Sequence, residues 1–246
     1  MIRFRNRCFC GLVIGLVLLV AVTTLEARSS YKKKRHNLVE QHIRNARTKT
    51  GVINDTSVLN AMMTVPRHRF VPADLRSKAY ENRPLPIGYG QTISQPYIVA
   101  YMTQLLEVGE GDTVLEVGTG SGYQAAVLAQ IVDRVFTIEI IPELHQKAQK
   151  RLNKLGYDNV TTRHGDGYYG WSKQAPFDGI IVTAAASHNP PPLIEQLKPG
   201  GNMIIPVGPP FRLQRLMLLE KGKQGDVQQR SLATVRFVPF RRTADQ

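Results

Sequence analysis

The sequence predicts an α/β fold: a Rossmann-like, doubly wound, mainly parallel β-sheet that ends in an antiparallel C-terminal hairpin. Short apolar runs suited to buried strands alternate with helical segments through the middle of the chain, which is typical of parallel sheets. Two strand-like segments, Arg215–Leu219 and Leu232–Val238, then flank a polar turn and predict the hairpin. The 246 residues can hold one domain of about 200 residues and an extension.

A strand, a glycine-rich loop and a helix follow one another in the centre of the sequence. The strand is expected over Thr113–Val117 and the helix over Gln124–Ile131, with Gly118, Gly120 and Gly122 between them. Absent side chains let a ligand approach the backbone, and the free N–H groups of a helix start face it. The spacing G-x-G-x-G differs from the dinucleotide fingerprint G-x-G-x-x-G, which disfavours a nicotinamide dehydrogenase.

Acidic residues stand at the ends of the expected strands. Glu116 lies in the first strand, Glu139 ends the second strand about twenty residues beyond the loop, and Asp166 follows the third strand. An acid at the end of the second strand can accept hydrogen bonds from ribose hydroxyl groups. Two further strands are expected over Phe177–Thr183 and Met203–Ile205. This order predicts a nucleoside-containing ligand at the carboxyl ends of the strands.

Motifs on both sides of this unit resemble those of one enzyme family. Gly88–Ala100 reads G-Y-G-Q-T-I-S-Q-P-Y-I-V-A, and Val65–Pro72 before it reads V-P-R-H-R-F-V-P. Phe177–Ala186 ends in V-T-A-A-A, and Val235–Phe240 reads V-R-F-V-P-F. With the acid–glycine loop–acid order, these motifs make residues 38–240 resemble the bacterial protein-L-isoaspartate (D-aspartate) O-methyltransferases, within the Rossmann-like S-adenosylmethionine-dependent methyltransferases.

The resemblance implies an activity and a cofactor. A methyl group would pass from S-adenosyl-L-methionine to the free carboxylate of L-isoaspartyl residues in damaged proteins, and the ester would start repair through a succinimide. Activity toward D-aspartyl residues is left open. The partners would be isoaspartyl proteins and peptides. We expect no metal, because the histidines lack paired ligand spacing and both cysteines lie in the N-terminal segment. We expect no nucleic acid partner, because most of the excess positive charge lies beside the apolar N-terminal run, and we expect a monomer.

The resemblance also implies roles for individual residues. Ser94 would be the catalytic residue and would hold the substrate carboxylate, and Val235, Phe237, Val238 and Pro239 would offer backbone to the substrate peptide. The cofactor would be bound by Gln91, Thr92, Ile93, Glu116, Gly118, Gly120, Ser121, Gly122, Glu139, Asp166 and Gly167. Spacing alone favours Ser94 as an ordinary N-cap of the helix Pro96–Leu106, and the resemblance reverses this preference. Animal members carry a histidine where this sequence has Val99, so no histidine role is transferred.

The N-terminal segment differs from the rest in charge and hydropathy. The net charge is +13, and residues 1–36 contribute +7 of it, from eight Lys or Arg and one acid. Residues 1–27 have the shape of a secretory signal peptide or a short membrane anchor, with the apolar run over residues 8–22. Residues 28–36 would be a basic linker, and residues 37–246 the methyltransferase domain.

Two features of the N-terminal segment make opposite predictions about the cellular location of the domain. A cleaved signal peptide would export the domain to the periplasm. The basic flank Tyr31–Arg35 opposes export, because positive charge is retained on the cytoplasmic side. The cofactor is made in the cytosol, so we expect a cytoplasmic domain, with membrane association through residues 8–22 as a variant of that location.

Two other functions share parts of this pattern. A methyltransferase acting on a small molecule or RNA would share the segment from Thr113 to Ile205 but lack the Ser94 loop and the Val235–Phe240 motif. A membrane-tethered binding protein without turnover would not need the intact cofactor motifs.

Phe211 and Phe240 are expected to belong to the core.

Overall fold

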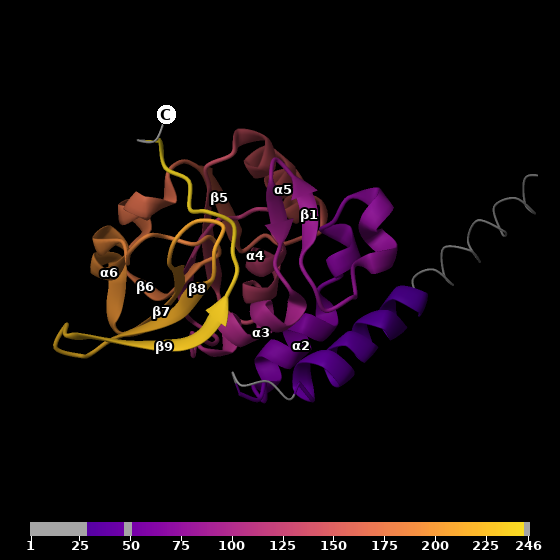
Figure 1. The fold of residues 1–246 in the computed structure, drawn as a ribbon, viewed down its shortest axis with the longest axis horizontal. Coiled ribbons are helices and arrows are strands. Elements are labelled where there is room, and N and C mark those ends of the chain that lie inside the picture. The colour runs from indigo at the N-terminus through magenta and orange to yellow at the C-terminus, as the bar shows by residue number, and fades with distance from the viewer. Residues whose placement is uncertain (1–28, 47–50, 244–246) are drawn as a thin grey trace, which may run out of the picture.

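The computed structural model describes residues 29–46 and 51–243. A seven-stranded sheet with the order β5-β4-β3-β6-β7-β8-β9 forms its centre, and a separate hairpin joins β1 to β2 (Figure 1). Strands β3 to β7 pair in parallel, whereas β8 and β9 are antiparallel to their neighbours. The predicted α/β fold with a C-terminal antiparallel hairpin is therefore confirmed.

The element bounds follow the expected strand–helix alternation. The strands are β1 (Leu85–Gly88), β2 (Gln91–Ile93), β3 (Thr113–Val117), β4 (Arg134–Glu139), β5 (Val160–His164), β6 (Phe177–Val182), β7 (Leu197–Val207), β8 (Gln214–Lys221) and β9 (Val227–Val235). The α-helices are α2 (Thr56–Thr64), α3 (Pro96–Gln104), α4 (Tyr123–Leu128), α5 (Pro142–Lys154) and α6 (Pro191–Gln196). Shorter turns of helix are η1 (Leu38–Arg44), η2 (Arg67–Arg69), η3 (Ala73–Lys78), η4 (Gly167–Tyr169) and η5 (Ser172–Gln174).

The sheet has a core on each face, because successive strand residues point to opposite sides. Val114 and Ile181 pack into a cluster that includes buried residues of α2, α3 and α4. Their neighbours Leu115 and Val182 pack into a second cluster, which includes Leu193 of α6. With both faces covered, the ligand-accessible part of the sheet is the edge formed by the carboxyl ends of its parallel strands.

Three expectations about local structure are wrong. Helix α3 begins at Pro96 and its N-cap position is Gln95, so Ser94 is not the N-cap. The Tyr97 N–H is instead bound by Asn82 Oδ1 at 3.0 Å. Strand β9 ends at Val235, three residues earlier than expected, because the chain then turns toward the end of β6. Phe211 is 82% exposed and lies in the loop between β7 and β8.

The basic segment before the domain includes residues that pack on it. Residues 29–37 are α-helical and continue into η1. The Tyr31 ring stacks on His68 with centroids 4.0 Å apart, and Arg35 Nη1 donates to the Tyr80 hydroxyl at 3.4 Å. The predicted apolar run of residues 8–22 lies outside the described residues, as does the rest of segment 1–28. Within the described ranges, no helix combines the length and apolarity needed to cross a membrane.

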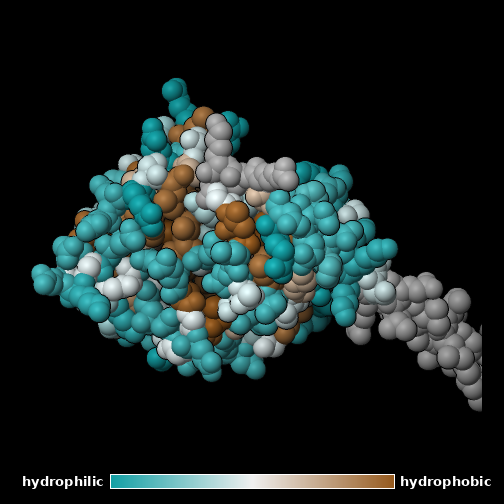
Figure 2. All heavy atoms as spheres, turned by 90° about the horizontal axis from the view of Figure 1, so that it is seen from below, coloured by the Kyte–Doolittle hydropathy of each residue, from teal (hydrophilic) through white to brown (hydrophobic). Residues whose placement is uncertain are grey.

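The surface seen from below in Figure 2 is mainly hydrophilic, with apolar side chains gathered in a few places between polar ones.

Candidate active site

The glycine loop follows a fully buried strand, and its shape depends on glycine. Gly118 has φ +99°, a conformation that residues with side chains rarely adopt. A Cβ atom at Gly118 would lie 2.4 Å from Thr183 Oγ1. The Gly118 N–H donates to the carbonyl of Ile138 in β4 at 2.8 Å, which ties the loop to the neighbouring strand. The loop backbone is therefore held close to the strand ends, with no room for a side chain.

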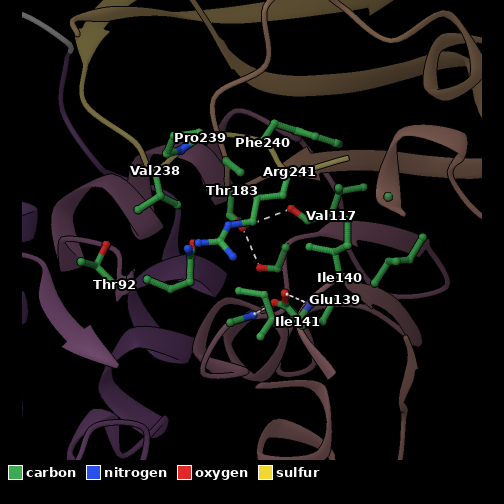
Figure 3. Close-up of a pocket in the computed structure, with 16 residues that line it drawn as sticks. Thr92, Val117, Glu139, Ile140, Ile141, Thr183, Val238, Pro239, Phe240 and Arg241 are labelled. Carbon is green, nitrogen blue, oxygen red and sulfur yellow. Dashed lines mark hydrogen bonds between the residues drawn. The ribbon is translucent and has the colours of Figure 1, made fainter. Parts of the chain in front are cut away.

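Thr183 fastens this loop from the other side. Its hydroxyl lies 2.7 Å from the Gly118 carbonyl oxygen and 3.1 Å from the Val117 carbonyl oxygen (Figure 3). The sequence analysis did not assign Thr183 to the site. A signal was present, because Thr183 directly follows β6, and β6 is parallel to β3 and adjacent to it. A polar side chain at that position must lie beside the loop.

Glu139 at the end of β4 is buried and bonded to the loop. Its Oε2 accepts from the Gly120 N–H at 2.7 Å, and its Oε1 accepts from the Ile141 N–H at 2.9 Å. Each carboxylate oxygen can accept more than one hydrogen bond, so the group still has capacity for hydroxyl donors. Glu139 therefore combines two tasks: it fixes the loop and presents an acceptor to the cavity that it lines.

A cavity open to solvent lies at this loop (Figure 3). Val238, Pro239 and Phe240 lie on one side of it, and Glu139 with Ile141 on the opposite side. Its lining includes these residues together with Gln91, Thr92, Val117, Gly118, Gly120, Ile138, Ile140, Gly167, Thr183, Ala184 and Arg241. Six of the residues predicted to bind the cofactor are thus brought together here: Gln91, Thr92, Gly118, Gly120, Glu139 and Gly167.

An inner pocket continues from this cavity toward helix α4. Of the predicted residues it adds Ile93, Ser94, Glu116 and Ser121. Gly122 lines neither space; its φ is +84° and its Cβ position faces Leu152, so it shapes the start of α4. Glu116 Oε2 accepts from the Thr137 hydroxyl at 2.6 Å, but its Oε1 is buried without a hydrogen-bond partner among the described residues.

That unpartnered oxygen tests whether S-adenosylmethionine fits the site. Burial, reinforced by the nearby charge of Glu139, raises the pKa of Glu116 to about 8, although the Thr137 hydroxyl and, more weakly, the backbone N–H of Ala125 oppose the shift. An unpaired buried polar atom is costly and invites a ligand group. An ammonium group such as that of the methionine end of the cofactor would both pair with Oε1 and favour the ionised carboxylate. The residues present therefore fit the predicted cofactor.

Asp166 lies beside the cavity and is held by the C-terminal segment. Its Oδ1 accepts from the Tyr168 N–H at 3.0 Å, and its Oδ2 accepts from Arg242 Nε at 2.9 Å and from the Thr243 N–H and hydroxyl, both at 3.2 Å. Burial alone would raise the pKa of Asp166, but these hydrogen bonds outweigh it and hold the pKa below its usual range. The Arg242 guanidinium also packs on the Tyr168 ring at 3.6 Å.

We define residues 236–243 as the C-terminal strap. It is anchored to the end of β6, because the Ala185 N–H donates to the Val238 carbonyl and the Phe240 N–H donates to the Ala185 carbonyl, each at 2.8 Å. Its other end is fixed by Asp166. Between these anchors the strap forms one wall of the cavity. No sequence motif indicates the contact between Arg242 and Asp166, which joins residues 76 positions apart.

A second hollow lies next to the cofactor cavity, between the start of α3 and the end of β9. Ser94 lines it, as do the predicted substrate residues Val235, Phe237 and Val238. Pro239 faces the cofactor cavity instead. Thr92, Thr183 and Val238 line both spaces, so the two spaces adjoin at these residues. The described residues include no group of three or more metal-ligating side chains.

Comparisons with known proteins agree with this geometry. The model of the Protein-L-isoaspartate(D-aspartate) O-methyltransferase family matches residues 35–244. Protein-L-isoaspartate O-methyltransferase 2 of Syntrophobacter fumaroxidans is 58% identical over 93% of this chain and 95% of its own length, and the Polaromonas sp. protein of the same name is 61% identical over 80% and 94%.

A solved structure gives the same result for the fold. A Plasmodium falciparum protein assigned as a protein-L-isoaspartate O-methyltransferase, in complex with S-adenosyl-L-homocysteine, superposes with a TM-score of 0.71 at 25% identity. The match covers 87% of this chain and 99% of that chain. With a family model that spans most of its length and relatives above half identity, this chain belongs to the protein-L-isoaspartate (D-aspartate) O-methyltransferase family.

Proposed function

We propose that this protein methylates the free carboxylate of L-isoaspartyl residues in damaged proteins, with S-adenosylmethionine as the methyl donor. The observation that carries this proposal is the junction of the two spaces at Thr92, Thr183 and Val238. Ser94 also lines the inner pocket together with Gly118 and Gly120 of the glycine loop, so a carboxylate held at Ser94 would face a donor bound on that loop. The bound cofactor would supply an electrophilic methyl group on a cationic sulfur.

The residues of the site form two groups: one holds the cofactor, and the other holds the substrate carboxylate that accepts the methyl group. Glu116 pairs with the ammonium group at the methionine end, and Glu139 accepts from the ribose hydroxyls at the second strand end. The glycine loop offers backbone to the rest of the ligand. Gln91 to Ile93 form β2 and cover the cavity from the side of the substrate hollow.

On the acceptor side, Ser94 and the end of β9 hold the substrate. Ser94 is placed between β2 and α3 and lines both the substrate hollow and the inner pocket. Its hydroxyl can donate to a substrate carboxylate. Strand β9 is the last strand of the sheet, so an extended peptide can lie along its end at Val235–Val238 and be recognised by its main chain. Main-chain recognition suits a substrate defined by a main-chain defect.

The chemistry needs orientation rather than a general base. A carboxylate with a pKa near 4 is already ionised at neutral pH. The protein must place one carboxylate oxygen in line with the methyl group and exclude water, and orientation of this kind can supply about 7–11 kcal/mol at its best. Ser94, Thr92 and Thr183 place hydroxyl groups in the substrate hollow. These three residues form no acid–base pair, which agrees with a reaction that needs orientation and no general base.

The test is methyl transfer to a matched pair of peptides. The full chain is incubated with radiolabelled S-adenosylmethionine and either an L-isoaspartyl peptide or the same peptide with a normal aspartyl residue. We expect labelled methyl ester on the isoaspartyl peptide alone, followed by its loss as the succinimide forms. Equal labelling of both peptides, or labelling of RNA in place of either, would contradict the proposal. A D-aspartyl peptide in a third arm determines whether that residue is also a substrate.

We propose further that residues 8–22 hold the chain at the membrane with the catalytic domain in the cytoplasm. The support is the basic flank, in which Lys32, Lys33 and Lys34 are exposed beside the domain. A reporter active only outside the cytoplasm, fused after Gln246, should be silent in the parent. It should gain signal when Lys32–Arg35 are replaced by Gln. Strong signal from the parent, with a mature chain that begins near Arg28, would show export.

A further inference from the structure

Arg67 in η2 is a fully buried arginine whose hydrogen bonds go to main-chain carbonyls. Its exposed fraction is 0%. Nε donates to the Ala79 carbonyl at 2.9 Å, and Nη2 donates to the Ser94 carbonyl at 2.8 Å and more weakly to the Arg83 carbonyl at 3.4 Å. No ion pair joins Arg67 to a carboxylate within the part of the chain that the structure describes. Burial lowers the pKa of Arg67 to about 10, so the side chain remains cationic at neutral pH.

Burying a cation without a counter-ion costs free energy, so a fully buried arginine needs a structural or functional explanation. A planar guanidinium can bond several acceptors at fixed angles, which a lysine cannot do. Here the acceptors come from two separate segments: Ala79 and Arg83 lie between η3 and β1, and Ser94 lies between β2 and α3. One further atom, Nη1, has no partner among the described residues. The hydrogen bonds of Arg67 therefore fix the backbone around Ser94, but they do not neutralise the buried charge.

The guanidinium also touches the cofactor side of the site. It packs over the ring of Tyr123 at 4.8 Å from the ring centroid. Tyr123 is the first residue of α4 and follows the glycine loop directly. One side chain thus joins the segment that holds the acceptor to the helix that starts at the cofactor loop.

Ser94 depends on this contact more than its neighbours do. The hydrogen bond from Arg67 is the one that Ser94 makes among the described residues. Its neighbours are fixed otherwise: Ile93 pairs with Leu85 in the β1–β2 hairpin, and Tyr97 is bound by Asn82. We propose that Arg67 is a positioning residue for methyl transfer, which fixes the Ser94 main chain so that its hydroxyl meets the substrate carboxylate in line with the methyl group. This inference rests on the proposed function.

A direct effect of the Arg67 charge would look different. Transfer neutralises the substrate carboxylate, so a nearby positive charge would stabilise the bound substrate more than the transition state. Loss of the charge would then raise KM and leave the transfer rate unchanged or faster. Loss of position would lower the transfer rate, because displacement by about 1 Å can cost on the order of 100-fold. Arg67→Lys keeps the positive charge but removes the forked guanidinium. The variant therefore distinguishes a role of the charge from a role in positioning Ser94.

The experiment is a double-mutant cycle between Arg67→Lys and Ser94→Ala in the full chain, read as the single-turnover rate of methyl transfer at saturating cofactor and isoaspartyl peptide. We expect Arg67→Lys to lower the rate at least about tenfold, with Kd for S-adenosylhomocysteine within about twofold of the parent. With Ser94→Ala already present, the same change should alter the rate less than about twofold, since the hydroxyl to be positioned is gone.

The control is Gln104→Ala. Gln104 also bonds main-chain groups from its side chain, accepting from the Asn54 and Asp55 N–H groups, but at the far end of α3. Its loss should lower stability and leave the transfer rate per folded molecule unchanged. Should Arg67→Lys fail to fold, Tyr123→Leu removes the ring that supports the guanidinium and should show the same dependence on Ser94.

Two outcomes of the cycle overturn the inference. One is a parental transfer rate in the folded Arg67→Lys variant, and the other is an equal loss of rate whether Ser94 is intact or already replaced by alanine. A rise in KM for the peptide without a change in the transfer rate would overturn it as well, because Arg67 would then affect substrate binding and not the alignment of Ser94 with the methyl group. An inert parent chain would instead overturn the proposed function, and the positioning role with it.

Discussion

The two halves of the active site are built in different ways. The part of the cofactor half built on the glycine loop comes from contiguous chain: β3, the loop and α4, with Glu139 supplied by the next strand. The acceptor half is assembled from segments far apart, namely the Ser94 loop and the end of β9, and the C-terminal strap lines both halves. The comparison teaches that the cofactor half is inseparable from folding of the sheet, whereas the acceptor half can be altered without loss of the fold.

Gly118→Ala should produce the largest effect and tests the first part of that comparison. The added Cβ would stand 2.4 Å from Thr183 Oγ1 at a strained φ, so either the loop or the Thr183 side chain that holds it must shift. We expect cofactor affinity to fall more than about 100-fold in a calorimetric titration. Gly200→Ala is the control, since Gly200 also has positive φ (+86°) but open space around it. A normal affinity for Gly118→Ala would mean that the loop is only a turn.

Glu116 should make the ligand-free protein less stable as pH rises. Its pKa is raised from 4.5 to about 8, so its contribution to stability is fully present below about pH 4.5 and is lost as pH rises through about 8. Glu116→Gln stays neutral and should remove this loss, a difference on the order of a few kcal/mol at pH 9. Urea unfolding at pH 5, 7 and 9 measures it, with the exposed Glu143→Gln as control. Identical pH profiles for parent and Glu116→Gln would contradict the raised pKa.

Glu116→Gln should also weaken cofactor binding, because an amide cannot neutralise the ammonium group. In the parent, calorimetry below pH 8 in buffers of different ionisation enthalpy should show that binding releases a proton. The variant should show no such release from this site. Together these results would show that the buried Glu116 side chain controls both the pH dependence of stability and the binding of the cofactor.

Ser94→Ala tests the acceptor half. Because Ser94 is not the N-cap of α3, its loss should leave the melting temperature nearly unchanged while the methyl transfer rate falls about tenfold or more. Asp55→Ala is the converse control: Asp55 caps α2 through the Ser57 and Val58 N–H groups at 2.8 and 3.1 Å. That variant should lose about 1 kcal/mol of stability with normal turnover. Full activity of Ser94→Ala would remove Ser94 from the catalytic assignment.

Arg242→Gln should have the smallest effect and concerns the strap. It removes the ion pair with Asp166 and the contact with Tyr168 but leaves the strap anchored at Ala185. We expect S-adenosylhomocysteine to dissociate a few-fold faster in stopped-flow experiments, because a partly exposed ion pair contributes only about 1 kcal/mol. The exposed Arg212→Gln is the control. Unchanged dissociation would show that the strap does not limit exit from the cavity.

The same division explains what the sequence could predict. Strand periodicity, glycine spacing and the acids at strand ends are local patterns, and they located β3 to β6, the glycine loop and Glu139. The predictions for Gln91 and Thr92, which line the same cavity, came from the family resemblance. The contacts of Thr183 with Gly118, Arg67 with Ser94 and Arg242 with Asp166 span 65, 27 and 76 positions. Spacing along the chain carries no information about such pairs. The N-cap assignment of Ser94 failed for a related reason, because Asn82 supplies the acceptor at the start of α3 from another segment.

The most direct test of the account is a crystal structure of the chain with S-adenosylhomocysteine and an isoaspartyl peptide bound together. We expect the cofactor product on the glycine loop with its ammonium group at Glu116. We also expect the peptide along Val235–Val238, with its free carboxylate at the Ser94 hydroxyl and directed past Thr183 toward the sulfur. A peptide bound elsewhere, or a carboxylate separated from the sulfur by the wall at Thr92 and Thr183, would contradict this expectation.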